Sequence, residues 1–206
     1  MRSHVLVDRD GSTPLDHDQV IGIRFSHLTT MGELDEIEDL NIQKGMEWLN
    51  RQKGDDYLST EFLCKLHERL FGDVWKWAGK FRTSEVNISK YRPYDIGPQL
   101  KNFFEDIKLW IEAGSMSWDE ISAEAHHRLV TIHPFPNGNG RTTRIYTEYL
   151  QKRNQQPVSS WGASLAHDSK ARRDLYIQSL RNADNGNFEA LIEFMREKKS
   201  APVDIR

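Results

Sequence analysis

Apolar residues recur at helical spacing along most of this chain, and short polar or glycine-containing breaks separate the runs. Between positions 58 and 70, one face of a helix would be formed by Leu58, Phe62, Leu66 and Leu70. Residues four positions apart lie on the same side of an α-helix, so this spacing buries a continuous apolar stripe. The pattern predicts a helix over residues 58–70 that packs inward.

Two sequences of the capping-box type indicate where further helices begin. Thr30 is followed three positions later by Glu33, and a second box spans residues 117–120. In such a box, the first residue's side chain bonds the backbone amide three positions on, and the last residue's side chain reaches back. The first box predicts a helix over residues 30–51, and the second predicts a helix that ends at His133. The buried stripe of that second helix is Trp118, Ile121, Ala125, Leu129 and Ile132.

The remaining periodic segments make the predicted fold class all-α. A helix that begins near Gly138 continues through residues 145–150, and two shorter helices are predicted over 175–183 and 188–195. Residues 83–98 break this pattern, because Val86 and Ile88 alternate with polar residues before a stretch with tyrosines and prolines. We interpret that segment as a short β-hairpin.

The length of the chain and the positions of residues that break helices define the expected domain organisation. Residues 1–25 carry glycine, proline and aspartate without periodicity, and we expect an extended N-terminal arm. The rest, residues 26–206, is long enough to bury a core and short for two independent domains, so we expect a single domain.

Charge and cysteine content narrow the possible environments and partners. The net charge is −3 with acidic and basic residues interspersed, which argues against direct binding of nucleic acid. Cys64 is the only cysteine, so an internal disulfide is impossible and a reducing cytoplasm is consistent with the sequence. We find neither an apolar run of membrane-spanning length nor the apolar core of a signal peptide, and we expect a cytoplasmic protein.

The stretch from His133 to Arg144 concentrates residues suited to phosphate chemistry. His133 can accept a proton near neutral pH and is a candidate general base. Gly138 and Gly140 allow positive φ, so backbone N–H groups can turn toward an anion at the start of a helix. Arg141 and Arg144 lie three positions apart, on one helical face, where both guanidinium groups can contact phosphate oxygens.

A polar turn between two helices is the alternative explanation, because such turns collect proline, glycine and asparagine for backbone reasons alone. The histidine ahead of the turn and the arginine pair behind it favour the anion site. The whole string, His-Pro-Phe-Pro-Asn-Gly-Asn-Gly-Arg-Thr-Thr-Arg, resembles the signature of the Fic (Fic/Doc) family. Further blocks at residues 26–34 and 70–82 resemble a Fic subgroup called mobile mystery protein B.

The resemblance implies a Fic-type helical domain that transfers AMP from ATP to a hydroxyl side chain of a target protein. It implies His133 as the catalytic base and ATP and Mg²⁺ as cofactors. The nucleotide-binding residues it implies are Phe135, Asn137, Gly138, Asn139, Gly140, Arg141 and Arg144. Asn137 stands where the family pattern has an acidic metal ligand, and its uncharged oxygen predicts weaker Mg²⁺ binding.

Within the same family, a Doc-like protein kinase is the second candidate activity, and a catalytically weak module that binds a nucleotide or a partner is the third. The resemblance also implies that the hairpin over residues 83–98 is a flap on which the target protein docks. By association, it implies a helix-turn-helix partner in a toxin-antitoxin-like pair. Self-inhibition by Glu33 is a weaker interpretation than the capping box, because Thr30 and Glu33 already account for one another.

Overall fold

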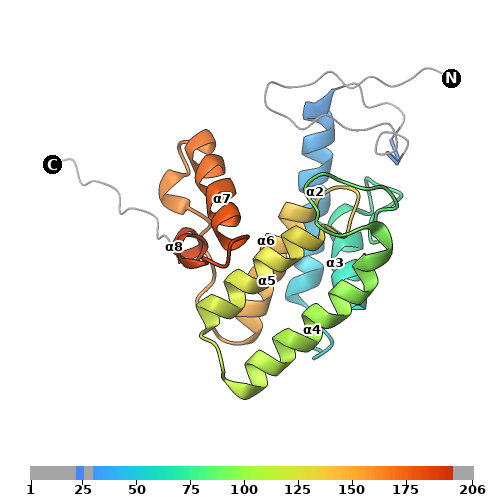
Figure 1. Cartoon of the computed structure of the whole chain (residues 1–206). Helices are drawn as coiled ribbons and strands as arrows, with labels where there is room; N and C mark the ends of the chain where they lie inside the picture. Colours follow the sequence, from blue (N-terminus) through green and yellow to red (C-terminus); the bar gives the residue numbers. More distant parts are fainter. Residues whose placement is uncertain (1–21, 26–29, 197–206) are drawn as a thin grey trace.

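A computed structural model describes residues 22–25 and 30–196 of the chain (Figure 1). The predicted N-terminal arm therefore lies outside the described residues except for residues 22–25. The helices are α2 (Met31–Asn50), α3 (Thr60–Phe71), α4 (Ile96–Ala113), α5 (Trp118–Ile132), α6 (Asn139–Arg153), α7 (Ser169–Ala183) and α8 (Glu189–Arg196), with 3₁₀ turns η1 (Pro93–Asp95) and η2 (Ala163–Leu165). The prediction of an all-α fold is confirmed.

The helices pack around a central pair formed by α5 and α6 (Figure 1). Helix α3 contacts α6, α4 contacts α5, and α2 covers α3 on the outside. On the other side of the pair, α8 contacts α5, and α7 packs against α8. Fully buried side chains from five of these helices form the core, among them Leu34, Leu66, Leu70, Phe103, Leu129 and Tyr146.

Both predicted capping boxes are present and fix the starts of α2 and α5. Thr30 Oγ1 accepts from the amide of Glu33, whose carboxylate accepts from the Thr30 amide at 3.1 Å. Ser117 and Glu120 make the same reciprocal pair in front of α5. The carboxylate of Glu33 therefore caps its own helix, in agreement with the preferred interpretation of the sequence.

Helix α4 was not expected from the sequence. Its apolar residues follow helical spacing, but Pro98 lies within its first turn and suggests a break. Proline is tolerated there because the amides of a helix's first turn have no intrahelical partner. The buried residues of α4 are Ile96, Leu100, Phe103, Phe104 and Ile107.

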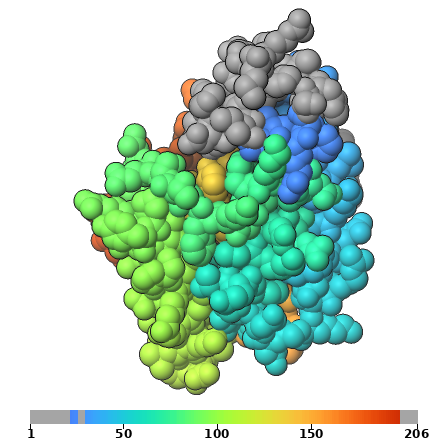
Figure 2. Space-filling view, turned by 90° about the vertical axis from the view of Figure 1, so that its right-hand side faces the viewer, coloured from blue at the N-terminus to red at the C-terminus, as the bar shows by residue number. Residues whose placement is uncertain are grey.

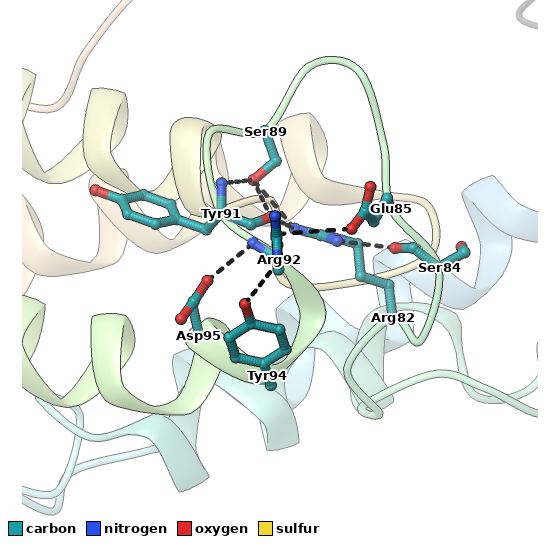
Figure 3. A network of polar contacts seen from close by, with 8 residues as sticks. All are labelled: Arg82, Ser84, Glu85, Ser89, Tyr91, Arg92, Tyr94 and Asp95. Atoms are coloured by element: carbon teal, nitrogen blue, oxygen red, sulfur yellow. Dashed lines mark hydrogen bonds and ion pairs between the residues drawn. The ribbon is translucent and has the colours of Figure 1, made fainter.

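The predicted β-hairpin over residues 83–98 is not formed. The described residues contain no strand, and the isolated bridge between Ile23 and Trp75 lies outside residues 83–98. Residues 83–92 form an irregular loop that closes around the Arg82 guanidinium (Figure 3), and residues 93–98 already belong to η1 and α4. The buried Arg82 side chain donates to carbonyl groups of this loop that strand pairing would otherwise satisfy. The alternation of apolar and polar residues in this segment therefore did not indicate a strand.

None of the helices in the described part of the chain combines the length and the apolar character needed to cross a lipid bilayer.

Candidate active site

The site lies in the loop that joins α5 to α6, and His133 is its first residue. His133 is the C-cap of α5, with φ 50° and ψ 59°, and its amide donates to the Leu129 carbonyl at 3.1 Å. A left-handed backbone is uncommon for a residue with a side chain and ends the helix abruptly. The sequence-based expectation that α5 delivers His133 at its end is confirmed.

The middle of the loop is held by Phe135 and Asn139. The Asn139 side chain accepts from the Phe135 amide at 2.9 Å and donates to the Phe135 carbonyl at 2.7 Å, and both residues are buried. Because both polar groups of Asn139 are used in this pair, the side chain fixes the shape of the loop. The family resemblance implies Asn139 as a nucleotide-binding residue, and its side chain is used within the loop, whereas no intrahelical partner exists for its backbone amide at the start of α6.

His67, which the sequence analysis did not single out, supports the loop from α3. Its Nδ1 accepts from the Gly79 amide at 2.8 Å, which leaves the proton on Nε2, and Nε2 donates to the Asn137 carbonyl at 3.0 Å. The ring also stacks on Phe135 with centroids 3.8 Å apart. Burial lowers the pKa of His67 to about 3, so this histidine is neutral and acts as a support.

The first turn of α6 supplies the predicted backbone amides. Gly138 is the N-cap with φ 73°, and the first intrahelical bond runs from the Thr142 amide to its carbonyl at 2.9 Å. The amides of residues 139–141 are therefore those that a helix start leaves free of intrahelical partners. Gly140 lies inside the helix and has no positive φ, contrary to our expectation, yet apart from its chain neighbours and the backbone of its own helix no atom lies within 4 Å of the place its Cβ would take.

The two signature arginines lie on one face of α6, as predicted. Arg141 pairs with Glu38 at 2.5 Å and lies over the Phe71 ring, 4.7 Å from its centroid. Arg144 lies over Tyr176, 5.9 Å from its centroid. Both arginines line a pocket of about 510 Å³ that is bounded on its far side by α7.

Glu38 is a further residue that the sequence analysis missed. It is buried on α2, accepts from the Trp75 indole and pairs with Arg141. A signal for it exists in the sequence, because Glu38 and Asn41 occupy the apolar face that Leu34 and Leu49 define. Polar residues on a buried helix face need partners, and here the partner is a signature arginine.

The surroundings of His133 keep its imidazole in the neutral form. Burial and, to a smaller extent, the positive charge of Arg82 lower its pKa to about 4, while the backbone of Val130 opposes the shift. The imidazole is therefore neutral at pH 7 and able to accept a proton.

The loop between α5 and α6 reaches the surface of the molecule. In Figure 2, the gold segment that contains this loop is visible between the green segment after residue 83 and the teal segment before it.

Taken together, a short loop joins the neutral imidazole of His133, at the end of α5, to the start of α6, which carries free amides and both arginines. Residues 57–151 match the family model described as Fic/DOC family. The chain therefore carries a Fic/DOC family domain.

Relatives with described activities share this domain. The protein adenylyltransferase fic-1 of Caenorhabditis elegans is 26% identical over 174 residues, covering 81% of this chain and 32% of the relative. The protein adenylyltransferase Fic of Aedes aegypti is 27% identical over 173 residues, covering 82% and 33%. The chain thus spans about a third of the length of these curated relatives.

Solved structures show the same fold. A structure of Fic-1 from C. elegans superposes with a TM-score of 0.63 at 25% identity, covering 77% of this chain and 46% of that one. An N-terminal Fic domain from Bartonella quintana with bound ADP gives a TM-score of 0.63 at 18% identity, covering 82% and 86%.

Proposed function

We propose that this protein is a protein adenylyltransferase that transfers AMP from ATP to a hydroxyl group of a target protein. The observation that carries the proposal is the neutral His133 imidazole at the end of α5, one short loop ahead of the α6 start that carries free amides and both arginines. The activity named for the C. elegans and Aedes aegypti relatives supports it.

In the proposed reaction, the target hydroxyl oxygen attacks the α-phosphorus of ATP. His133 accepts the hydroxyl proton, the bond from the α-phosphorus to the bridging oxygen breaks, and pyrophosphate leaves. The amides of residues 139–141 would hold phosphate oxygens, and Arg141 and Arg144 would neutralise charge on the outer phosphates.

The residues present fit the phosphates of ATP better than they fit a tightly bound Mg²⁺. The open space at Gly140 admits an anion against the helix start. For Mg²⁺, Asn137 offers one neutral oxygen, which already accepts from the Gly138 amide at 2.6 Å. The described residues contain no cluster of three or more histidine, cysteine or acidic ligands. We propose that Mg²⁺ is held mainly by the nucleotide, with Asn137 as a weak ligand.

The partners belong to the same proposal. The loop over residues 83–92, together with η1, borders the site and exposes Ile88 and Tyr94, which are 62% and 70% exposed. We propose that a target segment docks there. Assignment to the mobile mystery protein B subgroup, an antitoxin-like helix-turn-helix partner and a cytoplasmic location are parts of the proposal that rest on the sequence alone.

The decisive experiment uses purified protein with Mg²⁺ and ATP labelled at either the α or the γ position. Label from α-labelled ATP on the protein itself or on proteins of a lysate is expected. Label from γ-labelled ATP alone would indicate the kinase, and ATP binding without either label would indicate a binding module.

Two variants complete the test. His133→Ala is expected to reduce labelling by about 100-fold or more while ATP binding persists, because the base is lost and the phosphate site is kept. Undiminished labelling by this variant would contradict the proposal. Asn137→Asp is expected to tighten Mg²⁺ binding in the presence of ATP, and unchanged Mg²⁺ affinity would remove Asn137 as a ligand.

A further inference from the structure

Arg82 is among the largest fully buried side chains of the protein, at 2% exposed, and it is not paired with a carboxylate through any of its hydrogen bonds. Its guanidinium donates to the carbonyls of Ser84 at 2.8 Å and Tyr91 at 2.6 Å, and to Ser89 Oγ at 3.1 Å (Figure 3). Its Nε donates to the His133 carbonyl at 2.8 Å. One side chain therefore joins the loop over residues 83–92 to the candidate base.

The same group of residues holds the whole C-terminal end of α5. The carbonyls of residues 131 and 132 lie 2.9 and 3.1 Å from Ser89 Oγ and share its one hydroxyl hydrogen. Those of His133 and Pro134 accept from the side chain and the backbone amide of Arg82, both at 2.8 Å. Helix ends leave carbonyls without partners and carry partial negative charge, which a cation stabilises. Arg82 and Ser89 supply both the hydrogen bonds and the charge.

These contacts matter because His133 has an unfavourable backbone conformation. Its φ of 50° costs an L-residue about 1–2 kcal/mol. Such a conformation persists only where its surroundings impose it. Here, the Leu129 carbonyl fixes the His133 amide, and Arg82 fixes the His133 carbonyl.

The charge of Arg82 also acts on the His133 ring. Apart from burial, the positive charge of Arg82 and the backbone of Val130 are what shift the pKa of His133, in opposite directions. Burial lowers the pKa of Arg82, and the negative charge of Glu85 opposes this shift. A cation next to an imidazole disfavours the imidazolium, so Arg82 favours the form of His133 that can accept a proton.

We propose that Arg82 is a positioning residue, which keeps His133 in orientation and in its proton-accepting form and couples it to the loop on which the target docks. This inference rests on the proposed function of His133 as a base. Arg82 itself is buried beneath the loop and bonded through its guanidinium to protein groups, so it acts through His133.

Two substitutions separate its geometry from its charge. Arg82→Lys keeps the charge and loses the forked contacts, whereas Arg82→Gln loses the charge. We expect Arg82→Lys to lower kcat for AMP transfer by about 10- to 100-fold through misplacement of the base, with the acidic limb of the pH profile of kcat/KM unmoved. We expect Arg82→Gln to lower kcat and to move that limb upward by about one pH unit, because the imidazole becomes easier to protonate.

The pKa of His133 is measured directly by NMR titration of the imidazole, which does not depend on AMP transfer. It should rise in Arg82→Gln and stay near the wild-type value in Arg82→Lys. Arg128→Gln is the matched control, because Arg128 lies on α5, the helix that ends at His133, and its substitution removes a contact with Asp106 at 2.7 Å. The control is expected to leave the His133 titration unchanged, even if its melting temperature falls.

An unchanged His133 titration in Arg82→Gln, or an equal shift in Arg128→Gln, would overturn the inference. Wild-type kcat in Arg82→Lys would overturn its geometric part. If Arg82→Gln does not fold, Ser89→Ala tests the geometry with the charge in place, and it should lower kcat without moving the acidic limb. A wild-type protein that transfers no AMP would contradict the proposed function, and the NMR titration would still test the effect of Arg82 on His133.

Discussion

Gly138 and Gly140 stand two positions apart in the signature and have different reasons to be glycine. Gly138 has φ 73°, and a Cβ there would come within 2.7 Å of the Phe71 ring. Gly140 has an ordinary helical backbone, and its Cβ would meet open space. Gly138 is therefore required for its backbone conformation and close packing, whereas Gly140 leaves room for a ligand.

This division predicts opposite effects for two alanine substitutions. Gly138→Ala should lower the free energy of unfolding by about 1–3 kcal/mol, because strain and a steric clash add. Gly140→Ala should leave stability unchanged or raise it by about 0.5–1 kcal/mol, because alanine is favoured inside a helix, but it should weaken ATP binding. Urea unfolding and calorimetric titration with ATP measure the two effects. Equal stability of the two variants would contradict the assignment.

At the scale of secondary-structure elements, the ion pair between Glu38 and Arg141 connects α2 to the start of α6. The Glu38 side chain is 6% exposed and also accepts from Trp75, so its charge is compensated by two donors. A second ion pair on the same helix, Lys44 with Asp73, is 70% and 57% exposed. The two pairs offer a comparison between a buried and a solvated contact on one helix.

We expect Glu38→Gln to lower the free energy of unfolding by about 1–3 kcal/mol, because a charge-assisted bond is lost and Arg141 keeps an uncompensated charge. Asp73→Asn should change it by less than about 0.5 kcal/mol, since exposed pairs contribute little. Both are measured by chemical denaturation. If Asp73→Asn lowered the free energy of unfolding as much as Glu38→Gln does, burial would not explain the strength of the Glu38–Arg141 ion pair.

Across the whole molecule, buried histidines make stability depend on pH. Burial lowers the pKa of His67 and His126 to about 3 and that of His133 to about 4, whereas unfolding returns each to its ordinary value of 6.5. The unfolded chain therefore binds more protons than the folded one between these values. Their contribution to stability is complete above pH 6.5 and is lost as the pH falls toward the folded pKa values.

The expected outcome is a fall in the free energy of unfolding of up to about 4 kcal/mol per pH unit once the pH drops well below 6.5, about 1.4 for each histidine. Burial also raises the pKa of Glu124 and Glu148, which acts in the opposite direction closer to their ordinary value of 4.5. Denaturation between pH 7.5 and 5.5 measures the slope. His126→Gln should reduce the slope by about one third, and an unaltered slope in this variant would disprove the contribution of His126.

Local signals in the sequence determined much of this protein. The capping boxes at Thr30 and Ser117, the apolar stripe of α5 and the position of His133 at its end follow from contacts within one helix. The convergence of Arg141 and Arg144 on one face follows from helical spacing. Such features depend on residues only a few positions apart, so the sequence alone specifies them.

The tertiary structure decided what depends on residues far apart in the chain. Arg82 meets His133 across 51 positions, Glu38 meets Arg141 across 103, and His67 meets Asn137 across 70. No local pattern encodes these partners, and the same is true of the loop at residues 83–92, where a buried guanidinium replaces the strand pairing that alternation suggested. A buried polar group must be satisfied by whatever the packed helices bring near it, and only the completed fold fixes which group that is.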